Sequence, residues 1–166
     1  MAKSDKLLRP LNAGEKYTSL RHRLAYYLLI QVYTFLKTSS MREIPEAMKM
    51  LIEKAAGINV REAKRHPPEE YHKVLGSELA MHMGETFSSD YHVEDNDKNT
   101  KVVLDTCGCI SSVIEHAEEF NLSDTECKSI FCGSCMGGYK KSTEMLNLKF
   151  EGALTKKGCY MDFQTS

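Results

Sequence analysis

The sequence predicts an α+β domain in which N-terminal helices precede an antiparallel sheet built from two hairpins, with two helices between the hairpins. Three observations support this prediction. Apolar residues recur every three or four positions through most of the first half of the chain, as one face of a helix requires. The spacing changes to that of strands after residue 85 and again near the C-terminus. Helical spacing returns between these two regions.

Three helices are expected before the first strand. The first covers residues 15–37, where apolar residues occupy much of the helix circumference. Such a helix lies at the centre of the core or at a subunit interface, so we expect a homodimer built on it. The second helix is predicted from Ser40 or Glu43 to about Gly57. The third, opened by two prolines, is predicted over residues 67–84.

The first hairpin is expected over residues 86–106, where a polar turn at residues 94–99 separates two apolar runs. A helix follows from about residue 110 to residue 120, because its apolar positions again share one face. Residues 123–126 (Ser-Asp-Thr-Glu) match the capping box that starts another helix. That second helix carries three of the cysteines.

The final hairpin is predicted after Gly137-Gly138, from apolar residues at 145–163 that flank a turn at residues 155–158. The length fits one ordinary domain, and no repeat or low-complexity linker divides the chain. We therefore expect a single domain over residues 1–166, with residues 1–14 as a flexible N-terminal segment.

Charge and the N-terminal sequence exclude two classes of partner. The 22 Lys and Arg are mixed with 23 Asp and Glu, and without a long basic run the chain lacks the electrostatic footprint of a nucleic-acid-binding protein. The N-terminus lacks the apolar core of a signal peptide, and the longest apolar stretch, residues 24–36, is interrupted by Gln31 and Thr34. We expect a cytoplasmic protein without a membrane partner.

All six cysteines lie between residues 107 and 159, and no cysteine precedes them. A reducing cytoplasm disfavours structural disulfides, so metal binding or thiol chemistry is the better interpretation. Four thiolates complete a tetrahedral zinc site or hold an iron–sulfur cluster. The candidate metal ligands are Cys107, Cys109, Cys127, Cys132, Cys135 and Cys159.

Helical geometry divides these candidates. On a helix Cys132 and Cys135 share one face, whereas Cys127 lies on another. The spacing of the three resembles the run that binds a cluster in plant-type ferredoxins, with Cys159 as a fourth ligand, but a helix is not the loop that such a cluster needs. Cys132-Gly-Ser-Cys135 also has dithiol redox spacing, although its position inside a helix argues against that chemistry. The alternative is that the cysteines are buried core residues, above all Cys127.

The C-terminal half resembles a known family. The residues that carry the resemblance are Val102–Cys109, Asn121-Leu122, Cys127, Cys132 and Gly158–Phe163. Over about residues 70–164 the chain resembles the 4-vinyl-reductase-type small-molecule-binding domains and the related L-2-amino-thiazoline-4-carboxylic acid hydrolase-like proteins. The resemblance implies an α+β fold shared with subunits of a vesicle-tethering complex and dimerisation through helices. It also implies, as in some aromatic-sensing regulators, a zinc ion near the C-terminal cysteines.

The chain departs from that family at two positions. The family pattern has a glycine four residues before the closing cysteine and another cysteine eight residues before it, where this chain has Thr155 and Glu151. Because a carboxylate can also bind zinc, Glu151 is a candidate substitute for the missing cysteine.

Three functions follow from these observations. The first is a small-molecule-binding domain, a sensor or accessory, with a hydrophobic pocket between helices and sheet and a zinc ion or iron–sulfur cluster held by cysteines. The second is a hydrolase of the 2-amino-thiazoline-carboxylate type, which uses a metal-bound water or a cysteine nucleophile with His116 as base. The third is a metal-free assembly module. No motif surrounds His82, His92 or His116, so each is interpreted as a surface or half-buried histidine. His82 and His116 are the two to check for proximity to the thiols, and His92 is placed in the first strand.

Overall fold

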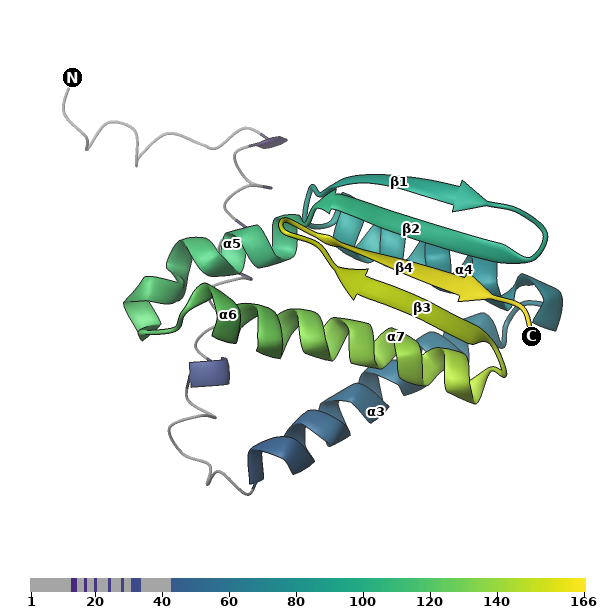
Figure 1. The fold of residues 1–166 in the computed structure, drawn as a ribbon, viewed down its shortest axis with the longest axis horizontal. Coiled ribbons are helices and arrows are strands. Elements are labelled where there is room, and N and C mark those ends of the chain that lie inside the picture. Colours follow the sequence, from purple (N-terminus) through teal and green to yellow (C-terminus); the bar gives the residue numbers. More distant parts are fainter. Residues whose placement is uncertain are drawn as a thin grey trace.

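The computed structural model describes residues 43–166 without interruption and, before them, residues 13, 14, 17, 20, 24, 28 and 31–33. The elements follow in the predicted order of helices, a hairpin, helices and a second hairpin, so the α+β prediction is confirmed (Figure 1). The helices are α3 (Glu43–Ala63), η1 (Pro68–Glu70), α4 (Tyr71–Leu79), η2 (Ala80–Glu85), α5 (Gly108–Ala117), η3 (Glu118–Phe120), α6 (Asp124–Cys127), η4 (Lys128–Cys132) and α7 (Gly133–Met145). The strands are β1 (Asp90–Asp95), β2 (Asn99–Thr106), β3 (Lys149–Leu154) and β4 (Cys159–Gln164).

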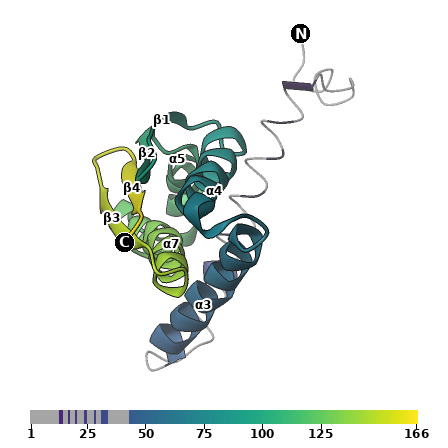
Figure 2. The same ribbon diagram turned by 90° about the vertical axis from the view of Figure 1, so that its right-hand side faces the viewer.

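The two hairpins form one antiparallel sheet in the order β1-β2-β4-β3. They join where β2 pairs with β4, with Val102 opposite Met161. Helices α4 and α7 contact the strands, and α3 packs against α4 and α7 as an outer layer. Figure 2 shows these helices on one side of the sheet, so the strands have an inner face toward the helices and an outer face away from them.

Alternate residues of β2 and β4 build the core on the inner face. Val102, Leu104, Met161 and Phe163 are all buried there. The ring of Phe163 lies 5.6 Å from that of Tyr139 on α7. Because each such side chain contributes roughly 1.5–3 kcal/mol when it leaves water, this face holds the sheet against the helices.

Gly137 and Gly138, after which the second hairpin was expected, lie inside α7. A Cβ atom on Gly137 would be 2.8 Å from Cδ1 of Ile52, so the glycine lets α7 approach α3 closely. Helix α7 therefore continues to Met145, and the prediction of a strand at residues 145–146 is wrong. Strand β3 begins at Lys149.

Helix α3 also runs further than predicted. The expected end near Gly57 is wrong because Val60 and Ala63 are buried against the core, and this burial favours two further helical turns. The capping box at residues 123–126 is confirmed. The Ser123 amide donates to Glu126 Oε2 at 2.8 Å, and the Glu126 amide donates to Ser123 Oγ at 3.3 Å.

The predicted first helix, residues 15–37, lies largely outside the described residues. Its described positions have helical backbone, and Leu20 among them is 65% exposed. The homodimer therefore stays a prediction. Residues 1–12 of the expected flexible segment also lie outside the described part. Among the residues that are described, no helix is both long and apolar enough to cross a membrane.

Candidate functional site

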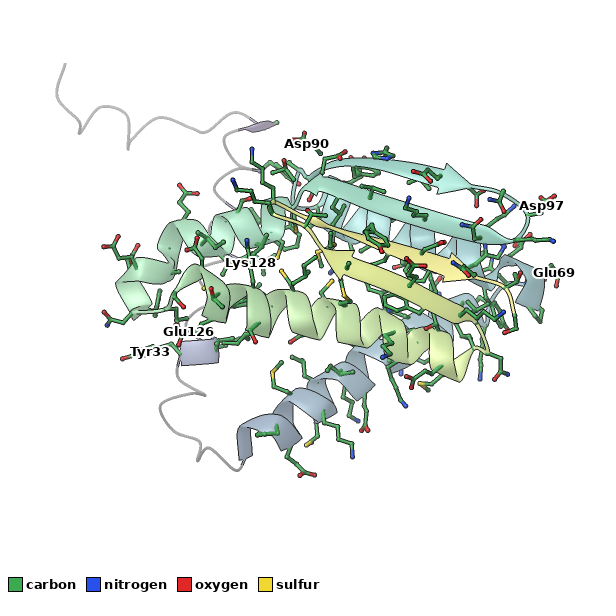
Figure 3. All side chains as sticks on the ribbon, in the orientation of Figure 1. Tyr33, Glu69, Asp90, Asp97, Glu126 and Lys128 are labelled. Atoms are coloured by element: carbon green, nitrogen blue, oxygen red, sulfur yellow. The ribbon has the colours of Figure 1, made fainter. Side chains whose placement is uncertain are left out.

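A cavity of about 730 Å³ lies between the inner face of the sheet and the helices. Its walls come from the described positions between residues 24 and 32, from α3, η2, α5, η4 and α7, and from residues of β2, β3 and β4. Most of the lining side chains are apolar, for example Met48, Met83 and Ile110. Figure 3 shows sulfur atoms gathered between α7 and the sheet.

Five of the six cysteines line this cavity. Cys107 and Cys109 come from the start of α5, Cys132 and Cys135 from the junction of η4 and α7, and Cys159 from the start of β4. None of the six forms a disulfide. Cys127 is fully buried and is not among the lining residues, as the helical geometry of the sequence indicated. We call the five the cavity cysteines.

Two glycines, each next to a cavity cysteine, allow the backbone to pass close to another part of the chain. A Cβ on Gly108 would lie 1.9 Å from the carbonyl oxygen of Phe87, and a Cβ on Gly158 would lie 1.9 Å from that of Leu104. No side chain fits at either place, so only glycine allows the backbone to pass so close. Gly108 separates Cys107 from Cys109, and Gly158 precedes Cys159. Sequence reasoning missed both roles, although Cys-Gly-Cys and Gly-Cys are visible signals.

Ser89 fixes the start of α5 against η2. Its hydroxyl donates to the carbonyl oxygen of Met83 and accepts the amide of Gly108 at 2.9 Å. The amides of a first helical turn have no partner within the helix, so Ser89 satisfies one of them from a distant part of the chain. Cys107 and Cys109 flank that amide and are thereby held in place.

Two cysteine-bearing segments, the start of α5 and the start of η4, are hydrogen-bonded to the turn between β3 and β4, which leads to the third. The Cys107 amide donates to the carbonyl oxygen of Lys157 at 3.0 Å. Lys128, labelled in Figure 3, lies at the start of η4. Its Nζ donates to the carbonyl oxygen of Lys156 at 3.0 Å. Main-chain carbonyl groups two and three residues before Cys159 therefore connect α5 and η4 to the turn that leads into β4.

Burial raises the pKa of the cavity thiols. The pKa of Cys109 and that of Cys159 rise to about 12, that of Cys132 rises to about 11, and that of Cys135 lies well above its usual value. Negative charge on neighbouring thiols, including Cys107, adds to each of these shifts, so the groups are close enough to interact. These four thiols are protonated at neutral pH unless a metal displaces the proton.

The dithiol and ferredoxin interpretations do not agree with this geometry. Helical backbone continues from η4 into α7, so no free helix N-terminus acidifies Cys132. The pKa of Cys132 is raised and not lowered. The run from Cys127 to Cys135 is helical rather than a loop, and Cys127 lies outside the cavity.

Two π-helical segments form part of the wall. Segment η2 contributes His82 and Met83, and η4 contributes Ile130 and Cys132. A π-helical turn is less favourable than an α-helical one and occurs often at functional sites. Both segments interrupt helices that periodicity predicts as continuous, and no feature of the sequence indicates them.

The remaining candidate residues fall on different sides of the sheet. His82 lines the cavity, whereas His116 is not among the lining residues and has Nδ1 3.4 Å from Glu119 Oε1.

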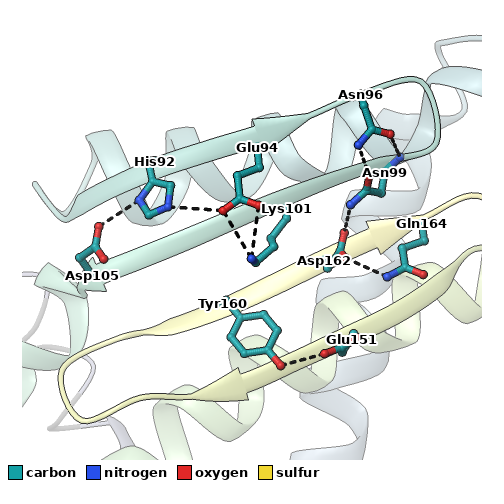
Figure 4. A network of polar contacts seen from close by, with 10 residues as sticks. All are labelled: His92, Glu94, Asn96, Asn99, Lys101, Asp105, Glu151, Tyr160, Asp162 and Gln164. Carbon is teal, nitrogen blue, oxygen red and sulfur yellow. Dashed lines mark hydrogen bonds and ion pairs between the residues drawn. The ribbon is translucent and has the colours of Figure 1, made fainter.

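On the outer face, the Tyr160 hydroxyl donates to Glu151 Oε1 at 2.9 Å (Figure 4). Strand alternation places Cys159 on the inner face, so Glu151 is not placed to replace a zinc ligand. That expectation is corrected.

The donor atoms at the cavity are almost all sulfur. No Asp or Glu is among its described lining residues, and His82 is the one imidazole there. As the side chains are placed, no group of three or more His, Cys, Asp or Glu within the described ranges could hold a single metal ion. A mononuclear site would therefore require the thiols to rotate toward one another.

Comparison of the chain with protein-family models, with curated proteins and with solved structures found no match in any of the three. The resemblance stated from the sequence thus rests on its motifs alone.

Proposed function

We propose that this domain binds a small apolar molecule in the cavity and a metal centre at the end lined by the cavity cysteines, and that it acts as a sensor or accessory domain. One observation carries the proposal. Five of the six cysteines, from three separate segments, line one cavity, and the sixth is buried elsewhere. Cysteines that served only as small core residues would have no reason to gather at one cavity.

The size and lining of the cavity support ligand binding. Pockets for small molecules usually measure about 300–1,000 Å³ and combine apolar walls with a few polar groups. Here the volume is about 730 Å³, and the polar lining groups include Gln31, His82 and Thr86. These three are exposed, whereas Cys107 and Cys159 are buried. An amphipathic or aromatic molecule suits such a cavity, with its polar atoms toward the exposed rim.

Thiol chemistry supports the metal centre. Thiolates prefer zinc, copper(I) and iron–sulfur clusters over calcium or magnesium. Each ligating thiol must lose its proton, so we expect metal uptake to release protons and to strengthen as the pH rises. The amides at the N-terminus of α5 and the ammonium group of Lys128 favour negative charge beside Cys107 and Cys132.

The hydrolase and assembly alternatives receive less support. His116 is not among the lining residues, and the raised pKa of Cys109, Cys132 and Cys159 disfavours a thiolate nucleophile. A metal-free assembly module does not explain why the thiols share a cavity. We therefore favour binding over catalysis.

Two methionines of α3 provide a matched test of ligand binding. Met48 lines the cavity, whereas Met50 is 58% exposed and is not among the lining residues. Met48→Trp fills the cavity and should weaken binding of an apolar fluorescent dye at least about tenfold, while Met50→Trp should leave it unchanged. Equal dye affinity of both variants, with both folded by circular dichroism, would remove the proposed ligand site.

A further inference from the structure

The lining of the cavity also indicates how the site selects its ligands. Resting on the proposed ligand site, we infer that the cavity selects by charge and not by shape, so that it binds uncharged molecules of varied outline and rejects carboxylic acids and amines of the same size. Two features of the described lining carry this inference. It contains no Asp, Glu, Lys or Arg, and methionines contribute to it from four separate elements.

The composition of the described lining makes an ionised ligand costly. Asp, Glu, Lys and Arg make up 27% of the chain, yet none of them is among the described lining residues. An ion that leaves water without meeting an opposite charge loses far more solvation free energy than an apolar or hydrogen-bonding group does. A carboxylic acid must therefore gain a proton on entry and an amine must lose one, and at neutral pH either change weakens binding.

Two hydroxyl groups of the lining have already donated their protons within the chain. Thr86 Oγ1 donates to the carbonyl oxygen of Met81 at 3.2 Å, and the Ser134 hydroxyl donates to that of Ile130. Each can still accept a hydrogen bond from an alcohol or an amide, but neither can donate one to a carboxylate. His82 could carry a positive charge, but it is exposed, where solvent weakens an ion pair. These polar groups therefore suit an uncharged polar group of the ligand.

Two main-chain amides at the start of α5 are occupied in the same way. The Gly108 amide donates to Ser89 Oγ at 2.9 Å, and the Cys107 amide donates to the carbonyl oxygen of Lys157 at 3.0 Å. The first amides of a helix have no partner within it and often bind an anion. Here two such donors are used by the chain itself, so a ligand carboxylate gains little at this end, although the helix dipole still favours negative charge on the nearby thiols.

Methionines make the wall of the cavity adaptable. Met48 of α3, Met83 of η2, Met136 of α7 and Met161 of β4 all line it. An unbranched side chain with three rotatable bonds and a polarisable sulfur packs against ligands of different outline, and methionine-rich surfaces are typical of proteins that accept many partners. Met48, Met83 and Met136 are only partly buried, so they can change rotamer at the cavity surface. The wall therefore imposes no single ligand shape.

Charge selection is tested on the full chain at neutral pH with three compounds that differ in one group: naphthalene methanol, naphthoic acid and naphthylmethylamine. Displacement of the uncharged dye Nile red measures the affinity of each. The alcohol should displace the dye, and the acid and the amine should bind at least about a hundredfold more weakly, because each must change its protonation to enter.

An acid or an amine that binds as tightly as the alcohol would overturn the charge selection and leave the proposed ligand site standing. Failure of the alcohol to displace the dye would also overturn the inference. Failure of the dye itself to bind would overturn the proposed ligand site as well.

Shape tolerance is tested with two alcohols of different outline, the flat naphthalene methanol and the flexible octanol. In the unchanged protein their affinities should lie within about tenfold of each other. The paired change Met48→Ile and Met136→Ile replaces two flexible side chains by stiff, β-branched ones of similar volume, and it should widen this ratio at least about fivefold.

The matched control is the paired change Met50→Ile and Met145→Ile on the same two helices. These methionines are 58% and 49% exposed and are not among the described lining residues, so the ratio should stay as in the unchanged protein. A ratio above about tenfold in the unchanged protein, or equal ratios in the two paired variants, would overturn the tolerance of shape. If circular dichroism shows that the cavity variant does not fold, the ratio in the unchanged protein decides.

Discussion

The two faces of the sheet carry opposite kinds of residue on the same strands. On the inner face Val102, Leu104 and Met161 are buried and lead to the cavity cysteines. On the outer face a polar network covers the strands (Figure 4), in which His92 lies 3.1 Å from Asp105 and Lys101 lies 3.3 Å from Glu94. The outer groups satisfy one another in contact with water, whereas the inner thiols lie among apolar groups. The difference is the reason for assigning the proposed binding site to the inner side.

This comparison predicts unequal costs of mutation. Changes on the inner face create cavities, clashes or buried charge, which are the costly classes of substitution. Changes on the outer face alter ion pairs that water and salt already screen.

Gly158→Ala should cost the most. Its Cβ would lie 1.9 Å from the carbonyl oxygen of Leu104, so the turn before Cys159 must move. We expect a loss of about 3–4 kcal/mol in the free energy of unfolding, measured by denaturant titration. Gly133→Ala is the control, because nothing lies within 4 Å of its Cβ position, and it should change stability by less than about 1 kcal/mol. Equal stability of the two variants would contradict the close approach.

Neighbouring residues of β2 compare the two faces directly. Leu104 is 1% exposed on the inner face, whereas Val103 is half-buried on the outer face. Leu104→Ala should lower the free energy of unfolding by about 3 kcal/mol, and Val103→Ala by about 1 kcal/mol or less. Similar losses, measured by the same denaturant titration, would show that both faces are packed.

Most of the fold follows from local patterns that the sequence displays. Alternation of apolar residues predicts both hairpins, and the capping box at residues 123–126 predicts a helix start that the structure has. The errors arise where tertiary packing overrides local preference. Glycine usually destabilises the interior of a helix. Gly137 nevertheless lies inside α7, because Ile52 of α3 fills the space that a side chain would need.

The site was predictable only in part. Helical geometry separates Cys127 from Cys132 and Cys135, and the structure brings the latter pair to the cavity. The sequence could not predict that Cys107 and Cys109 join them, because that depends on Ser89 and Gly108 meeting across the fold. Glu151 failed as a candidate ligand because strand alternation, counted from Cys159 through the turn, places it on the outer face.

His72 is a buried polar group on the inner side, with Nδ1 2.9 Å from Thr100 Oγ1. Burial lowers its pKa below 6.5, although Asp95 opposes this. The unfolded chain then binds a proton that the folded chain does not, so stability should fall as the pH drops below 6.5. His72→Asn cannot take up this proton and should show a shallower loss in unfolding titrations between neutral and mildly acidic pH. An unchanged slope would mean that His72 does not contribute.

Lys101→Met should have the smallest effect. The side chain pairs with Glu94 on the outer face, where both groups are in contact with solvent. We expect a change below about 0.5 kcal/mol at low salt, and still less at high salt, measured by denaturant titration. A loss above about 2 kcal/mol would mean that the outer network supports the fold as strongly as the inner face does.

The most direct test of the central claim is the metal content of the protein purified without oxygen, measured by elemental analysis with and without the paired change Cys107→Ser and Cys135→Ser. If the cavity cysteines hold a metal centre, the unchanged protein should carry about one centre per chain, and the paired variant should lose most of it. A wild-type protein with less than about a tenth of an equivalent of any transition metal, even after incubation with iron, sulfide and zinc, would contradict the account.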